Sequence, residues 1–193
     1  VYISAVGTNV TLLATDRYYF IIGCGGGADE ASYARLMFSP YVYGKTLKGV
    51  VIRSTSWEDL WGCKVWTKGS LTIPIYASSG FADSVQQWFL SSEELTKRQQ
   101  EFWGTFLPWS ADGFLGSGIM KEYRAVLPQY WQYPTVLISQ STDITFDGIV
   151  IQLIPTGAST DGLMVYLPAP GILIMGEFIG RQLPDAGMLP NDG

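Results

Sequence analysis

The stretch Val50–Cys63, VVIRSTSWEDLWGC, decides how the rest of this sequence is interpreted. Its first residues are β-branched and apolar, which predicts a buried strand over Gly49–Arg53. A short polar loop follows, and Glu58 and Asp59 then favour a helix start, because acidic side chains stabilise the first helical turn. The segment is therefore predicted to be a strand, a loop and a helix start, with Asp59 as a candidate functional carboxylate or simply a helix-terminal acid.

Composition predicts one globular domain. The sequence has 193 residues, of which 47% are hydrophobic and 15% charged, enough for a substantial core. The net charge of −5 and the lack of a basic block argue against a nucleic-acid partner. No apolar run reaches the roughly 18 residues of a membrane helix, and no signal-peptide pattern is visible. The cellular compartment stays open.

The sequence contains no histidine, the side chain that most zinc sites and most general-base chemistry use. Two cysteines, Cys24 and Cys63, are too few for a tetrahedral structural zinc site. They fit either a disulfide or two small buried apolar side chains.

Strand and helix patterns alternate in blocks along the chain. Apolar residues at helical spacing predict a helix over Ala28–Phe38, and two more helices are expected after Phe81. Asp147-Gly148 predicts a hairpin turn. Strands are expected at residues 1–6, 10–14, 18–22, 49–53, 71–77, 135–138, 144–146, 149–154, 163–167 and 172–175. Strands, then helices, then strands predict a layered α/β domain with mixed sheets.

The central stretch resembles the metal-binding motif of the metallo-β-lactamase superfamily, in which a strand precedes His-x-His-x-Asp-His. The same frame here reads Thr55-Ser56-Trp57-Glu58-Asp59-Leu60. Val10–Ile22 is similar to the opening hairpin of that superfamily, and Ile73–Phe81 to a segment of its alkyl sulfatase branch. The resemblance implies an αββα sandwich with mixed sheets, formed by residues 1–193 as a single domain. The family's last histidine ligand would fall near or beyond residue 193, so a domain incomplete at its C-terminal end is expected.

A second segment, Pro155–Glu177, resembles the alkyl sulfatase branch most closely. That branch carries one glutamate ligand after a turn and another nineteen positions later. The corresponding residues here are Ala158 and Glu177. Tyr166-Leu167-Pro168, between them, fits the same pattern.

The resemblance therefore implies a degenerate metal site. Thr55, Trp57 and Leu60 stand where histidine ligands are expected, and Ala158 stands where the first glutamate is expected. The two carboxylates Asp59 and Glu177 are retained. Two carboxylates could hold Mg²⁺ or Ca²⁺ weakly, but not a dinuclear zinc centre. No catalytic residue and no cofactor are expected. The alternative is an active alkyl sulfatase-type hydrolase of sulfuric esters with a zinc cofactor, which would require other residues at these positions.

The glycine-rich segment Gly23–Gly27 offers a further alternative. With Ala28 it matches the G-x-G-x-x-A fingerprint of dinucleotide-binding folds, and Arg53 could contact an NADP 2′-phosphate. Asp29 and Glu30 would repel a pyrophosphate at the same helix start, and a hairpin precedes the glycines. The segment is therefore expected to be a tight connection between a strand and a helix.

Aromatic residues make up 14% of the chain, and one cluster of them is a candidate binding surface. It consists of Phe102, Trp103, Phe106, Trp109 and Phe114. These side chains could line an apolar pocket or contact another protein. A fold that has lost its chemistry and is rich in aromatic residues is expected to act as a structural or interaction subunit, in a homo-oligomer or a larger complex.

Overall fold

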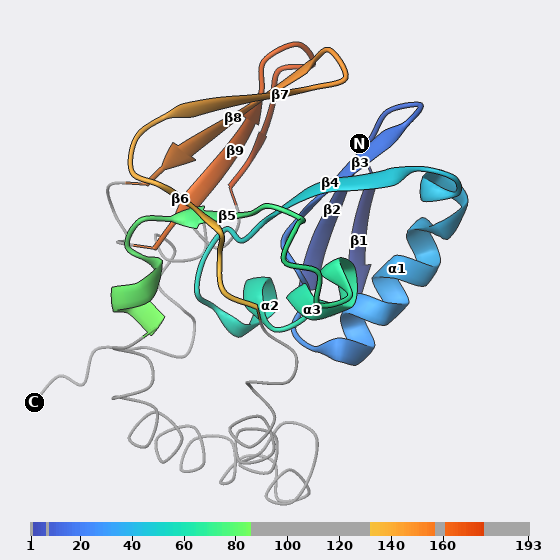
Figure 1. Cartoon of the computed structure of the whole chain (residues 1–193), viewed down its shortest axis with the longest axis horizontal. Coiled ribbons are helices and arrows are strands. Elements are labelled where there is room, and N and C mark those ends of the chain that lie inside the picture. The colour runs from blue at the N-terminus through green and yellow to red at the C-terminus, as the bar shows by residue number, and fades with distance from the viewer. Residues whose placement is uncertain (1, 7, 86–131, 157–160, 176–193) are drawn as a thin grey trace, which may run out of the picture.

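A computed structural model describes residues 2–6, 8–85, 132–156 and 161–175 of the chain. These residues form two β-sheets, one packed against the other, with helices on the outer face of the first sheet (Figure 1). Among the described residues, no helix is both long and apolar enough to cross a membrane.

The first sheet has six strands in the order β1-β2-β3-β4-β5-β6. The first two pairings are antiparallel and the remaining three are parallel, so the sheet is mixed as predicted. The strands are β1 Tyr2–Val6, β2 Thr8–Ala14, β3 Tyr18–Ile22, β4 Thr46–Val51, β5 Ile75–Ser78 and β6 Val136–Ile138.

The second sheet is wholly antiparallel, with the order β10-β9-β8-β7. Its strands are β7 Thr142–Phe146, β8 Ile149–Pro155, β9 Leu163–Leu167 and β10 Ile172–Ile174. Asp147 and Gly148 join β7 to β8 with positive φ angles of 48° and 78°. Both angles belong to a type I′ hairpin turn, which confirms the turn predicted from the sequence.

The helices are α1 Ala28–Val42, α2 Trp57–Leu60 and α3 Cys63–Thr67, and residues 81–85 begin another. Helix α1 runs beyond the predicted end at Phe38 and includes Pro40. Proline lacks an N–H and should leave the carbonyl of Leu36 without its helical partner. The hydroxyl of Ser39 donates to that carbonyl at 2.7 Å instead, so the helix continues through the proline.

Strand β5 begins four residues later than predicted, at Ile75 instead of Leu71. Leu71 is 79% exposed, whereas Ile75 is fully buried. Pro74 cannot donate a hydrogen bond, although its carbonyl accepts one from the N–H of Val50 at 3.0 Å. The strand therefore begins after the proline.

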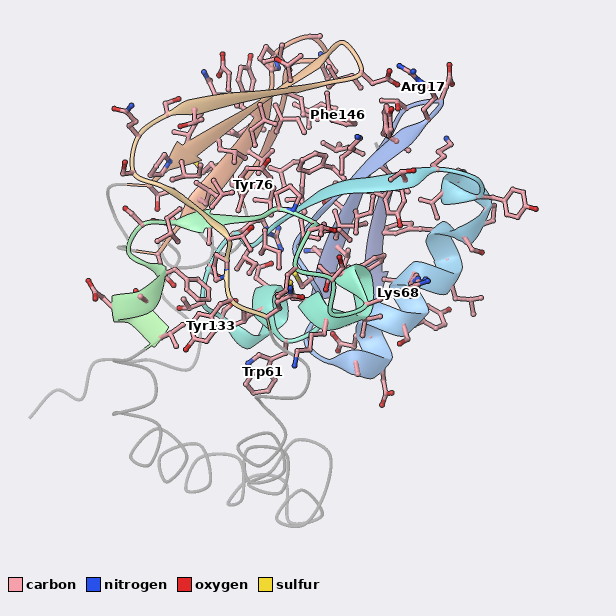
Figure 2. The ribbon with its side chains drawn as sticks, viewed as in Figure 1. Arg17, Trp61, Lys68, Tyr76, Tyr133 and Phe146 are labelled. Atoms are coloured by element: carbon pink, nitrogen blue, oxygen red, sulfur yellow. The ribbon has the colours of Figure 1, made fainter. Side chains whose placement is uncertain are left out.

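Two hydrophobic cores account for the layers. One lies between the first sheet and the helices, and the other lies between the two sheets. Strand β4 supplies both, because Val50 belongs to the helix-side core and Val51 to the inter-sheet core. Phe146 of β7 packs on Phe20 of β3 with ring centroids 5.0 Å apart, and Figure 2 shows Phe146 directed into the space between the sheets.

The described residues thus supply three of the four layers of the expected αββα sandwich, a helical layer and both sheets. The second helix of the pair expected after Phe81, at residues 91–106, lies outside the described residues. The same holds for the aromatic cluster from Phe102 to Phe114.

Candidate functional site

The candidate site lies where β4 ends and the chain turns into α2. Arg53, in the loop after β4, is 8% exposed, and Asp59, in α2, is fully buried. The Nε of Arg53 donates to Oδ1 of Asp59 at 3.0 Å, and Nη2 donates to the same oxygen. The hydroxyl of Ser54 donates to Oδ2 of Asp59 at 3.2 Å. Both oxygens of this carboxylate are therefore hydrogen-bonded within the protein.

The guanidinium of Arg53 also reaches the first hairpin. Its Nη2 donates to the backbone carbonyl of Asn9, in β2, at 3.0 Å. Gly23 leaves room for this contact, because a Cβ at that position would lie 2.9 Å from Nη2 and 3.0 Å from Oδ1 of Asp59. Gly23 also has a φ of +75°, which side chains rarely adopt. A larger residue at position 23, directly after β3, would therefore strain the backbone and crowd the Arg53–Asp59 pair.

Thr55 connects the site to the second sheet. Its amide N–H donates to Oδ2 of Asp161 at 2.8 Å, and its hydroxyl donates to the same oxygen. Asp161 lies just before β9 and is 5% exposed. The N–H of Leu163, the first residue of β9, donates to the carbonyl of Arg53 at 2.7 Å. The loop after β4 is therefore bonded to both sheets.

The structure shows how three of the predicted ligand positions are used. Asp59 pairs with Arg53, so its role exceeds that of a helix-terminal acid. Thr55 binds Asp161, and Leu60 is 1% exposed in the helix-side core. The Trp57 side chain, Ala158 and Glu177 lie outside the described residues.

A zinc pair does not fit the donors found in the described part of the chain. There, no group of three or more His, Cys, Asp or Glu side chains is placed to hold a metal ion. The carboxylate of Asp59 already has a cation, the guanidinium of Arg53, within hydrogen-bond distance. A second cation at the same oxygens would meet the repulsion of the first.

The glycine loop between β3 and α1 is occupied by the protein itself. The N–H of Gly26 donates to Oε2 of Glu30 at 2.9 Å, so a carboxylate from α1 takes the place where a phosphate would bind. The loop joins β3 directly to α1, as predicted, and Gly23 and Gly25 within it have φ angles of +75° and +90°, which favour glycine. Gly62 packs closely against this loop, because a Cβ there would lie 2.2 Å from the carbonyl oxygen of Cys24. Arg53, the residue considered for a 2′-phosphate, is committed to Asp59 and Asn9.

Cys24 and Cys63 are free thiols buried in the helix-side core. Burial is the main cause that raises the pKa of Cys24 well above its ordinary value, and a hydrogen bond to Cys63 raises it further. The carbonyl of Cys24 accepts a hydrogen bond from Nε1 of Trp66 at 2.9 Å. The two cysteines act here as packed apolar side chains, which was one of the two predicted roles.

The roles of Asp161 and Arg53 in this site were not predicted from the sequence. Asp161 was not singled out, and no short-range pattern links it to Thr55, 106 positions away. Arg53 was considered only for a phosphate contact. A usable signal was present, because an arginine at the end of an apolar strand needs a nearby acid if it is buried, and Asp59 is close in sequence.

The two sheets, the helical layer and the position of this loop define the metallo-β-lactamase-like fold. No protein-family model matches the sequence, and no curated protein matches it either. Solved structures do match, and the sequence identities of those described below show the fold alone.

A metallo-β-lactamase from Pontibacter korlensis is 16% identical with a TM-score of 0.52, and the match covers 89% of this chain and 63% of that one. The sec-alkylsulfatase Pisa1 from Pseudomonas sp. is 20% identical with a TM-score of 0.57, and the match covers 83% of this chain and 26% of that one. A double mutant of Pisa1 gives 19% identity and a TM-score of 0.60, over 86% of this chain and 27% of that one. The chain thus spans less than two thirds of the lactamase and about a quarter of the sulfatase.

Proposed function

We propose that this chain is a non-catalytic domain with a metallo-β-lactamase-like fold that acts as a structural or interaction subunit. One observation carries the proposal: the buried carboxylate of Asp59, at a position that resembles a metal ligand, is bonded to the guanidinium of Arg53. A carboxylate held by an internal cation is not available to position a metal-bound water. The fold would then serve as a scaffold.

The competing function is that of a zinc-dependent alkyl sulfatase. The experiment compares the purified chain with an active sec-alkylsulfatase prepared in the same zinc-supplemented medium. Both are dialysed against a mild chelator, analysed for zinc by plasma mass spectrometry and assayed with a secondary alkyl sulfate. We expect far less than one zinc per chain and background hydrolysis. Near-stoichiometric zinc with hydrolysis above background would refute the non-catalytic proposal.

We also propose that the domain assembles with a second copy of itself through α1. Large apolar side chains recur along the outer face of this helix: Tyr33 is 46% exposed, Leu36 67%, Met37 53% and Tyr41 42%. Their spacing places them on one stripe, and stripes of this kind are uncommon on monomers.

A second copy is the partner that this geometry favours. Within the described residues β1 has one neighbour in its sheet, β2, and α1 packs against both strands (Figure 1). A two-fold axis beside β1 would pair the two β1 edges and bring the two α1 helices side by side. The aromatic cluster from Phe102 to Phe114 remains the other proposed contact.

A further inference from the structure

We infer that the guanidinium of Arg53 is an internal cation that performs the cross-linking expected of a metal ion at this place in the fold. The inference rests on the proposed non-catalytic function. Arg53 and Asp161 would together hold the loop after β4 to α2 and to both sheets.

The buried carboxylate of Asp59 needs a compensating charge. Asp59 is fully buried, and an ionised carboxylate removed from water is strongly destabilising unless a partner compensates it. Arg53 supplies that compensation through Nε at 3.0 Å and through Nη2. A guanidinium stays protonated in proteins, so this cation is permanent. Unlike a bound metal, it cannot be removed by a chelator.

Arg53 also bonds to several separate segments of the chain. The guanidinium binds the carboxylate of Asp59 in α2 and the carbonyl of Asn9 in β2. The same residue's own carbonyl accepts the N–H of Leu163 at the start of β9. The guanidinium therefore joins α2 to β2, and the backbone of the same residue extends the connection to β9 of the second sheet.

Thr55, which stands at the first histidine position of the motif, makes hydrogen bonds in place of a metal bond. Its N–H and hydroxyl both bind Asp161, next to β9. This bond links the loop after β4 to the second sheet without a metal between them. The polar residues around the site thus replace coordination bonds with hydrogen bonds and one ion pair.

The test compares two arginines that each pair with an aspartate. Arg53 is the buried member, and Arg17, which pairs with Asp147, is the exposed control with 70% of its side chain accessible. Arg53→Met should lower Tm by about 10 °C, because removing one partner of a buried pair leaves the other uncompensated. Arg17→Met should lower Tm by no more than about 2 °C.

A double variant separates the ion pair from general packing. Arg53→Met with Asp59→Asn removes both charges and should recover at least half of the Tm lost in Arg53→Met. Wild-type Tm should not change on addition of EDTA.

Three results would overturn the inference: a Tm for Arg53→Met within about 2 °C of wild type, a double variant no more stable than Arg53→Met, or a fall of wild-type Tm with EDTA. If Arg53→Met yields no folded protein, the double variant decides, since a folded double variant supports the inference and an unfolded one refutes it. The zinc content of the wild type tests the proposed function separately, so either can fail alone.

Discussion

Thr55 donates its amide N–H and its hydroxyl to the same oxygen, Oδ2 of Asp161, which lies 106 residues further along the chain. Thr55 lies in the loop after β4 of the first sheet, and Asp161 precedes β9 of the second. The N–H of Leu163 adds a bond of 2.7 Å to the carbonyl of Arg53 beside it. The two sheets are therefore joined by polar contacts at this end, in addition to the apolar core between them.

Thr55→Val should destabilise the fold because it removes the hydroxyl donor while keeping the amide and the side-chain shape. A hydrogen bond to a charged group is worth about 1.5–3 kcal/mol, and the free energy of unfolding should fall by that amount in urea titrations. Thr142→Val is the control, since its hydroxyl donates to the carbonyl of Gln140 at an exposed site. Equal effects of the two substitutions would contradict a special role for the Thr55–Asp161 contact.

Much of the fold could be predicted from local patterns. The apolar runs at Val50–Ile52 and Leu163–Leu167 predicted strands that the structure confirms to within a few residues. The turn at Asp147-Gly148 was predictable because few residue pairs tolerate two positive φ angles. Such signals lie within a few residues of one another, so the sequence displays them directly.

The polar network of the site could not be predicted in the same way. The bond between Thr55 and Asp161 depends on how the two sheets are stacked, and no local pattern encodes that. The continuation of α1 through Pro40 depends on the hydroxyl of the neighbouring Ser39 finding the carbonyl of Leu36. Both features are hydrogen bonds formed by side chains whose residue type permits many other partners.

Gly62→Ala should destabilise the protein through a steric clash. Gly62 has an ordinary φ of −84°, so alanine suits its backbone. Its Cβ, however, would lie 2.2 Å from the carbonyl oxygen of Cys24 and 2.5 Å from Cβ of Ala31. Forcing an atom this close to a backbone oxygen should cost about 2–3 kcal/mol or more, which urea titration would reveal.

Gly69→Ala is the matched control for this clash. Gly69 has a φ of +72°, and a Cβ added there would meet nothing within 4 Å, so the cost of the substitution is conformational alone, about 1 kcal/mol. A Gly62→Ala variant as stable as Gly69→Ala would show that α3 can move away from the glycine loop. The packing of Gly62 against Cys24 would then be less tight than the structure indicates.

Cys24 should make the folded state less stable at high pH. Burial, and then the hydrogen bond to Cys63, raise the pKa of this thiol above its ordinary value of 9.0. Above pH 9 the unfolded chain loses a proton that the folded chain keeps, so the free energy of unfolding falls as pH rises. Below pH 9 the thiol is protonated in both states and the contribution is fully present. Unfolding titrations at pH 8 and 10 would measure the difference.

Cys24→Ala is the control for this pH dependence, because it removes the thiol while the tyrosines still titrate. The pKa values of Tyr19 and Tyr76 are also raised by burial, so part of the loss above pH 10 should persist in the variant. An identical decline in wild type and variant between pH 8 and 10 would show that Cys24 is not its source. In the folded protein the protonated, buried thiol should also react slowly with thiol reagents.

Leu36→Glu should disrupt self-association if α1 is the contact surface. Leu36 is 67% exposed near the middle of the apolar stripe, so a glutamate there costs the isolated fold little and places two like charges at a two-fold interface. Light scattering at micromolar concentration should show a dimer for the wild type and a monomer for the variant. Leu71→Glu, 79% exposed in the loop before β5, should remain dimeric. A wild-type chain that is a stable monomer with a cooperative melt would refute the proposed assembly. The exposed apolar side chains of α1 would then be compatible with a folded monomer in water.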